Sequence, residues 1–98
     1  MLIRIVRMTF QPEKVRDFLV IFENSKNKIK GSEGCQHLEL MRDYHDENIF
    51  STYSHWDNEE ALNNYRNSEV FKQIWEETKD MFLEKPAVYS LKKFIQVG

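Results

Sequence analysis

The chain begins with a segment in which apolar and polar residues alternate with the period of a β-strand. Residues 2–10 (LIRIVRMTF) are rich in Ile, Val and Phe, which favours a strand. One face of this strand carries Leu2, Arg4, Val6, Met8 and Phe10, and the other carries Ile3, Ile5, Arg7 and Thr9. Because both faces are partly apolar, we expect both to be covered, one by helices and the other by a second sheet.

The next segment has the apolar spacing of an amphipathic helix. Pro12 suits the first turn of a helix, and the pattern predicts a helix over residues 12–28 that ends before Gly31. Its apolar stripe, at positions i, i+3, i+4 and i+7, consists of Val15, Phe18, Leu19 and Phe22.

A second helical stripe follows in the other half of the chain. Asp57 as N-cap and Glu60 at N3 form a capping box, which predicts the start of this helix. Asn67-Ser68 is expected to break or re-cap it. The apolar face consists of Ala61, Leu62 and Tyr65 and continues with Phe71, Ile74, Trp75, Thr78 and Phe82.

Three further strands complete the prediction. They cover residues 35–43, 49–56 and 88–97, with a hairpin loop at 44–48 between the first two. The order β-α-β-β-α-β is the ferredoxin-like arrangement of an α+β protein with an antiparallel sheet, in a single domain over residues 1–98. Helices then cover only one face of the sheet, so we predict a homodimer that covers the other face.

Composition restricts the possible partners. The 98 residues carry a net charge of −2 with both signs interspersed, which gives no electrostatic reason to expect binding to nucleic acid or an anionic membrane. No apolar run has transmembrane length, and the charged N-terminus is too short for a secretory signal. A single cysteine, Cys35, excludes an internal disulfide and fits a reducing compartment, so we expect a cytoplasmic protein.

The histidines and the cysteine are the first candidates for chemistry. His37 and His55 lie on neighbouring predicted strands, and the strand register, which the sequence leaves open, decides whether they share a face. His45 is a solvated loop residue. No H-x-x-x-H pattern and no cluster of carboxylates supplies a third metal ligand at helical spacing, so no metal site is expected. Cys35 is better explained as a small buried residue than as a nucleophile.

The aromatic residues predict a pocket. Trp56 shares a strand face with Phe50, Thr52 and Ser54, and two small polar residues between two large rings leave room for a ligand. Tyr65 and Trp75 lie on the helical region that covers this face. The rings alone could fill a core, but the combination favours a pocket between helices and sheet.

The run from Trp56 to Phe71 resembles the antibiotic biosynthesis monooxygenase family. The pattern is W-x-x-x-E-A-L (residues 56–62), then Tyr65, then S-x-x-F (residues 68–71). The resemblance extends over nearly the whole chain and includes the proline after the first strand and Glu33-Gly34-Cys35 before the second. It implies a ferredoxin-like fold that pairs as a dimeric α+β barrel.

The resemblance also implies a function and a site. It implies oxidation of a small aromatic or quinol-like substrate without flavin, metal or haem, because the deprotonated substrate itself supplies electrons to dioxygen. We expect Tyr65 and His37 as catalytic residues, and Thr52, Trp56, Phe71 and Trp75 as substrate-binding residues. Tyr65 stands where many members carry histidine, which makes a hydrogen-bond donor a better expectation there than a base.

Three alternatives remain at the level of sequence. The chain is a cofactor-independent monooxygenase, or a non-catalytic dimeric barrel that binds a small apolar ligand, or a dimer whose aromatic residues serve packing alone. Haem degradation is not expected. The residues that match those of haem-degrading members are Val6, Tyr65 and Trp75, and none of them is the histidine that ligates iron.

Overall fold

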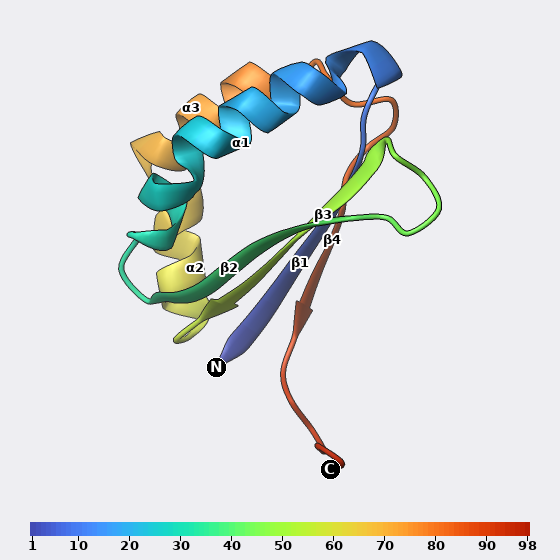
Figure 1. Cartoon of the computed structure of the whole chain (residues 1–98). Helices are drawn as coiled ribbons and strands as arrows, with labels where there is room; N and C mark the ends of the chain where they lie inside the picture. Colours follow the sequence, from blue (N-terminus) through green and yellow to red (C-terminus); the bar gives the residue numbers. More distant parts are fainter.

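The computed structural model describes all residues from Met1 to Gly98 and has the expected ferredoxin-like fold. Four antiparallel strands form one sheet in the order β2-β3-β1-β4, and the helices cover one of its faces (Figure 1). The elements are β1 (Leu2–Thr9), the 3-10 helix η1 (Pro12–Lys14), α1 (Val15–Lys30), β2 (Cys35–Arg42), β3 (Ile49–Trp56), α2 (Glu59–Arg66), α3 (Glu69–Thr78) and β4 (Ala87–Leu91). No helix is long and apolar enough to cross a membrane.

The register of the two central strands separates the sheet into a covered and an open face. Leu2 pairs with Trp56 and Val6 with Thr52, so these side chains lie on the covered face beneath the helices. Two apolar clusters form the core there. One contains Met8, Phe10, Phe18 and Phe50, and the other contains Cys35, Trp56 and Leu62.

The second helical region is divided as the sequence predicts, but its first cap differs. The Asn58 side chain, not that of Asp57, accepts the hydrogen bond of the Ala61 amide at 2.8 Å, so the predicted capping box does not form. Asp57 instead accepts a hydrogen bond from Gln36. Ser68 re-caps the chain at the start of α3, where its hydroxyl accepts a hydrogen bond from the Phe71 amide.

The last strand is shorter than predicted. It ends at Leu91, although the apolar pattern extends to Val97. Leu91 pairs with Ile3, and beyond this point only Leu2 remains of β1. The segment after Leu91 therefore extends away from the sheet (Figure 1).

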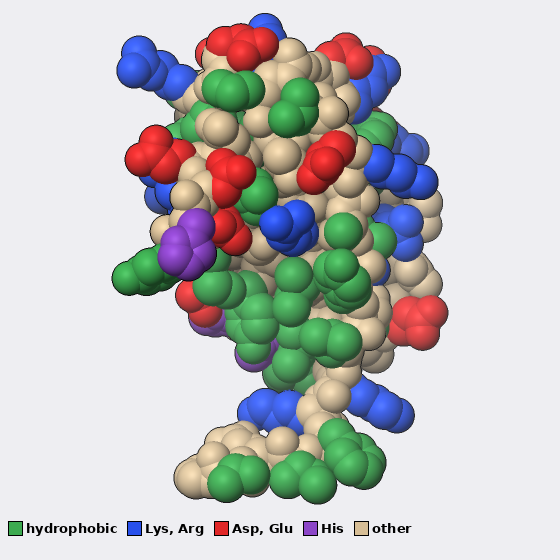
Figure 2. All heavy atoms as spheres, turned by 90° about the vertical axis from the view of Figure 1, so that its right-hand side faces the viewer, with side chains coloured by type: hydrophobic (Ala, Val, Ile, Leu, Met, Phe, Trp, Pro, Cys, Tyr) green, Lys and Arg blue, Asp and Glu red, His purple; other side chains and the backbone are tan.

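The open face of the sheet is rich in apolar and aromatic side chains. It carries Ile3, Ile5, Met41, Tyr53, Tyr89 and Leu91, together with His37 and His55. Figure 2 shows hydrophobic side chains gathered over this face, with the apolar C-terminal segment below them. No helix lies over this face (Figure 1).

Candidate functional site

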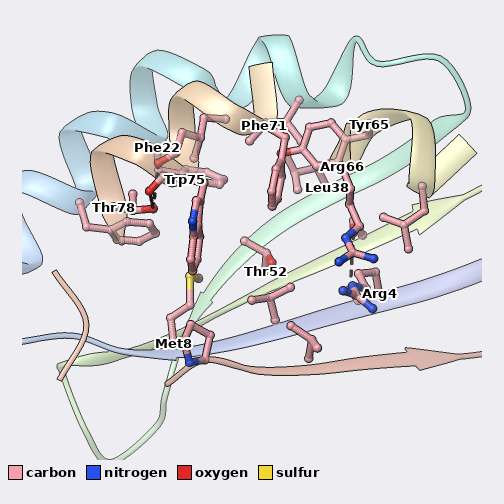
Figure 3. Close-up of a pocket in the computed structure, with 18 of the residues that line it drawn as sticks. Arg4, Met8, Phe22, Leu38, Thr52, Tyr65, Arg66, Phe71, Trp75 and Thr78 are labelled. Atoms are coloured by element: carbon pink, nitrogen blue, oxygen red, sulfur yellow. Dashed lines mark hydrogen bonds between the residues drawn. The ribbon is translucent and has the colours of Figure 1, made fainter. Parts of the chain in front are cut away.

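A pocket of about 450 Å³ lies between the helices and the covered face of the sheet (Figure 3). It is lined by members of both core clusters, including Met8 and Phe18 from one and Trp56 and Leu62 from the other. The sequence-predicted residues Thr52, Trp56, Tyr65, Phe71 and Trp75 all lie in its lining. The pocket is therefore where sequence alternation placed it.

The floor of the pocket has one free hydroxyl. Trp56 donates its indole N–H to the Ser54 hydroxyl at 3.0 Å, and Ser54 in turn donates to the Arg4 carbonyl at 3.5 Å. These contacts satisfy Ser54 and Trp56. Thr52 lies beside them on β3 and its hydroxyl makes no hydrogen bond with the protein, which leaves it available to a ligand.

One wall consists of three stacked or edge-on rings. The Trp56 and Tyr65 rings stack with centroids 5.1 Å apart, and the Phe71 ring meets Tyr65 edge-on at 5.4 Å. Only 1% of Trp56 is exposed, because Cys35 and Leu62 also pack against it. Most of the Trp56 surface is therefore in contact with protein atoms. Tyr65 and Phe71 form the outer layer of this wall.

The other wall is more open. Trp75 on α3 is 44% exposed, and its ring lies 5.9 Å from that of Phe82. An indole that retains this much accessible surface beside a cavity can pack against a flat ligand without displacing protein atoms. Trp75 is therefore the more accessible of the two tryptophans.

Tyr65 is suited to donate a hydrogen bond and unsuited to act as a base. Burial raises the pKa of its phenol above the usual value, with a smaller contribution from Cys35, so the hydroxyl keeps its proton at neutral pH. Its oxygen makes no hydrogen bond with the protein. The proton is therefore free for an acceptor on a ligand.

His37 is not in the pocket, and the predicted placement there was wrong. His37 pairs with His55 on the open face, where the two imidazole rings lie 5.1 Å apart and His37 contacts Glu39. Simple alternation would put His37 on the same face as Cys35. A β-bulge between Cys35 and His37 shifts the register, so the two side chains point to opposite faces.

The pocket has basic residues that the sequence interpretation missed. Arg4, Arg66 and Lys85 line it, and no aspartate, glutamate or histidine does. The signal for Arg4 was present, because it alternates with Val6 and Met8 on the strand face that meets the helices. Arg66 follows Tyr65 at the end of α2, where a solvated position would have been the ordinary expectation.

The remaining candidates do not form a metal or nucleophile site. No group of three or more His, Cys, Asp or Glu side chains is placed to hold a metal ion. Cys35 is buried, and burial raises the pKa of its thiol, which lowers its reactivity. This agrees with its interpretation as a small buried residue.

Fold and pocket together define a ferredoxin-like α+β domain with a mainly apolar cavity beneath its helices. The sequence profile of the antibiotic biosynthesis monooxygenase family matches residues 1–77, and the chain belongs to this family. No protein of curated function matches the sequence.

Solved structures share the whole fold at low sequence identity. A conserved protein from Methanosarcina mazei Go1 is 21% identical, with a TM-score of 0.89 over 96% of this chain and 94% of its own. An antibiotic biosynthesis monooxygenase is 19% identical, with a TM-score of 0.91 over 97% and 100%. A protein from Mycobacterium tuberculosis is 14% identical, with a TM-score of 0.88 over 99% and 98%. At these identities the similarity establishes the fold alone.

Proposed function

We propose that this protein is a cofactor-independent monooxygenase that oxidises a small aromatic, quinol-like substrate in the pocket between helices and sheet. The observation that carries the proposal is the cavity of about 450 Å³, whose lining combines aromatic rings with the free hydroxyls of Thr52 and Tyr65. Family membership supports the type of reaction. A flat aromatic body fits between the Tyr65–Phe71 wall and Trp75, with its oxygens directed at the two hydroxyls.

The protein's part in such a reaction is to bind, orient and stabilise an anion. A quinol anion, dioxygen and one proton from solvent give a hydroxyquinone and water: one oxygen atom enters the product, the other leaves as water, and the substrate supplies all the electrons. No residue in the lining is an ordinary base at neutral pH, because Tyr65 keeps its proton. The substrate must therefore lose its proton to solvent, and hydrogen bonds from Tyr65 and Thr52 stabilise the resulting oxyanion.

Oxygen consumption tests the proposal. We expect the protein to accelerate oxygen uptake with at least one member of a panel of hydroquinones and anthrone, and labelled dioxygen to supply one oxygen atom of the product. Trp75→Leu should lower the rate about tenfold because it removes the accessible ring, a loss of about 1.4 kcal/mol. Tyr44→Leu, at a loop residue that is 94% exposed, is the control. No uptake with any substrate would refute the enzymatic function.

A second candidate is a non-catalytic barrel that binds a small apolar ligand. The specific observation in its favour is the lack of a carboxylate or imidazole in the lining, which leaves no protein group to remove a proton. Saturable binding of quinols without oxygen uptake would favour this candidate over the enzyme.

We also propose that the protein acts as a homodimer in the cytoplasm. The apolar open face of the sheet supports the dimer, since a second copy of the same face would cover it. The single, unpaired thiol supports a reducing compartment.

A further inference from the structure

The α2 end of the pocket brings two arginines together without an acidic partner. Arg4 comes from β1 and Arg66 from the last turn of α2, and Figure 3 shows the Arg66 side chain directed toward Arg4 at this end of the pocket. The only hydrogen bond that the Arg4 guanidinium donates is to the Ser90 hydroxyl, at 2.8 Å. Neither arginine is part of an ion pair. The ion pairs of the chain lie on its surface and join a lysine or a histidine to a glutamate.

This arrangement carries a cost at Arg4, which is partly buried, whereas Arg66 is exposed to solvent. Burial, together with the nearby Arg66 charge, lowers the pKa of Arg4, which reflects the cost of holding two like charges beside a cavity of low polarity. Arg66 gains some compensation from the carbonyl end of α2, but Arg4 in the middle of the sheet has no such source. Like charges that converge on a cavity are typical of a site for the opposite charge.

We infer that the pocket selects an aromatic acid, whose carboxylate binds between Arg4 and Arg66 while its rings lie against the apolar walls. Guanidinium groups match a carboxylate in geometry, because each can donate two parallel hydrogen bonds to it. Lys85 lines the same pocket and adds a third positive charge. The inference rests on the proposed function for the location of the site, and it adds the acidic class of the substrate.

Calorimetric binding of two matched probes tests this inference. 2-Naphthoate and 2-naphthalenemethanol share one ring system and differ in charge. We expect the wild-type protein to bind the carboxylate at least about tenfold more tightly, and this preference to shrink as salt is raised. Arg66→Gln should weaken naphthoate binding about tenfold and change the binding of the alcohol less than about twofold. Arg16→Gln, at an exposed position of α1 outside the pocket, is the matched control.

Arg4→Gln extends the test to the residue on the sheet. It should give the same selective loss, and thermal unfolding of both variants shows whether they fold. If wild type binds both probes equally, or if Arg66→Gln weakens both equally, the inference is overturned while the monooxygenase proposal stands. If naphthoate binds with the expected arginine dependence but no quinol supports oxygen uptake, the inference stands and the enzymatic proposal fails. If neither probe binds, the inference is overturned.

Discussion

At the scale of single residues, Tyr65 has two roles: its ring packs in the core, and its hydroxyl is available to a substrate. Its ring stacks on Trp56 and meets Phe71, so it belongs to the core on one side. Its hydroxyl has no partner in the protein and retains its proton because burial raises its pKa. A donor of this kind can bind a substrate oxygen in both its neutral and its anionic form, and the bond to the anion is the stronger one.

Tyr65→Phe separates these two roles. We expect the free energy of unfolding to change by less than about 1 kcal/mol, because no hydrogen bond within the protein is lost. Turnover of a quinol that the wild type oxidises should fall about 10- to 150-fold, since a charge-assisted hydrogen bond contributes about 1.5–3 kcal/mol. Urea unfolding and oxygen uptake measure the two effects, with Tyr44→Phe in the exposed loop as control. Unchanged stability and unchanged turnover would show that the hydroxyl has no role.

Residue chemistry also explains what sequence alone could and could not predict about the site. Thr52, Trp56 and Tyr65 were found because alternation in a strand and spacing in a helix fix which side chains face each other. His37 was misplaced because a β-bulge has no sequence signal of its own and reverses the face of the residue that follows. Arg66 was missed because it is an exposed arginine at the end of a helix, and only the tertiary structure places it in the pocket lining with Arg4.

At the scale of elements, the break between α2 and α3 positions the pocket walls. Ser68 donates its hydroxyl proton to the Tyr65 carbonyl at 2.6 Å and accepts a hydrogen bond from the Phe71 amide at 3.3 Å. It thus joins the end of one helix to the start of the next.

The turn before β2 packs tightly against α2. Gly34 in this turn has a φ of 84°, and a Cβ at this position would lie 2.5 Å from the Ala61 Cβ. Only glycine allows this approach of β2 to α2.

Ser68→Ala tests the contribution of this break. We expect a loss of about 1–2 kcal/mol in the free energy of unfolding, because the N-cap of α3 loses its acceptor. Denaturant unfolding measures the loss. Ser25→Ala makes the same chemical change in the interior of α1, where alanine is the better helix former, and it should be neutral or slightly stabilising. Equal effects of the two substitutions would contradict the capping role.

Elements also differ in how well their ends could be predicted. The predicted β3, residues 49–56, agrees with the observed strand, because a turn and a capped helix bound it on either side. The second helix has two adjacent residues able to cap it, Asp57 and Asn58, and the sequence does not distinguish them. The end of β4 depends on where β1 begins, and no local pattern near Leu91 carries that information.

At the scale of the whole molecule, the exposed surface is large for the length of the chain. It measures 7009 Å². A compact monomer of this mass would expose about 5,900 Å². The excess of about 1,100 Å² is comparable with the roughly 800 Å² that one partner contributes to a standard interface. Phe94, Ile95 and Val97 contribute to it, with Phe94 92% exposed. The open sheet face and this apolar segment are the surfaces that a second copy would cover.

Pairing through the open face can be tested with substitutions at two positions that are about equally exposed in the single chain. We expect light scattering at micromolar concentration to give a mass of twice 11.9 kDa. Tyr89 on the open face is 51% exposed and Val20 on α1 is 55% exposed, so a glutamate at either position is harmless to an isolated chain. If the open faces pair, Tyr89→Glu buries a charge at their contact, which is costly, whereas Val20→Glu remains in solvent. Tyr89→Glu should therefore shift the protein toward the monomer and lower its thermal stability, and Val20→Glu should do neither. A wild-type protein that remains monomeric would contradict pairing through the sheet, and a Tyr89→Glu dimer as stable as the wild type would place the interface elsewhere.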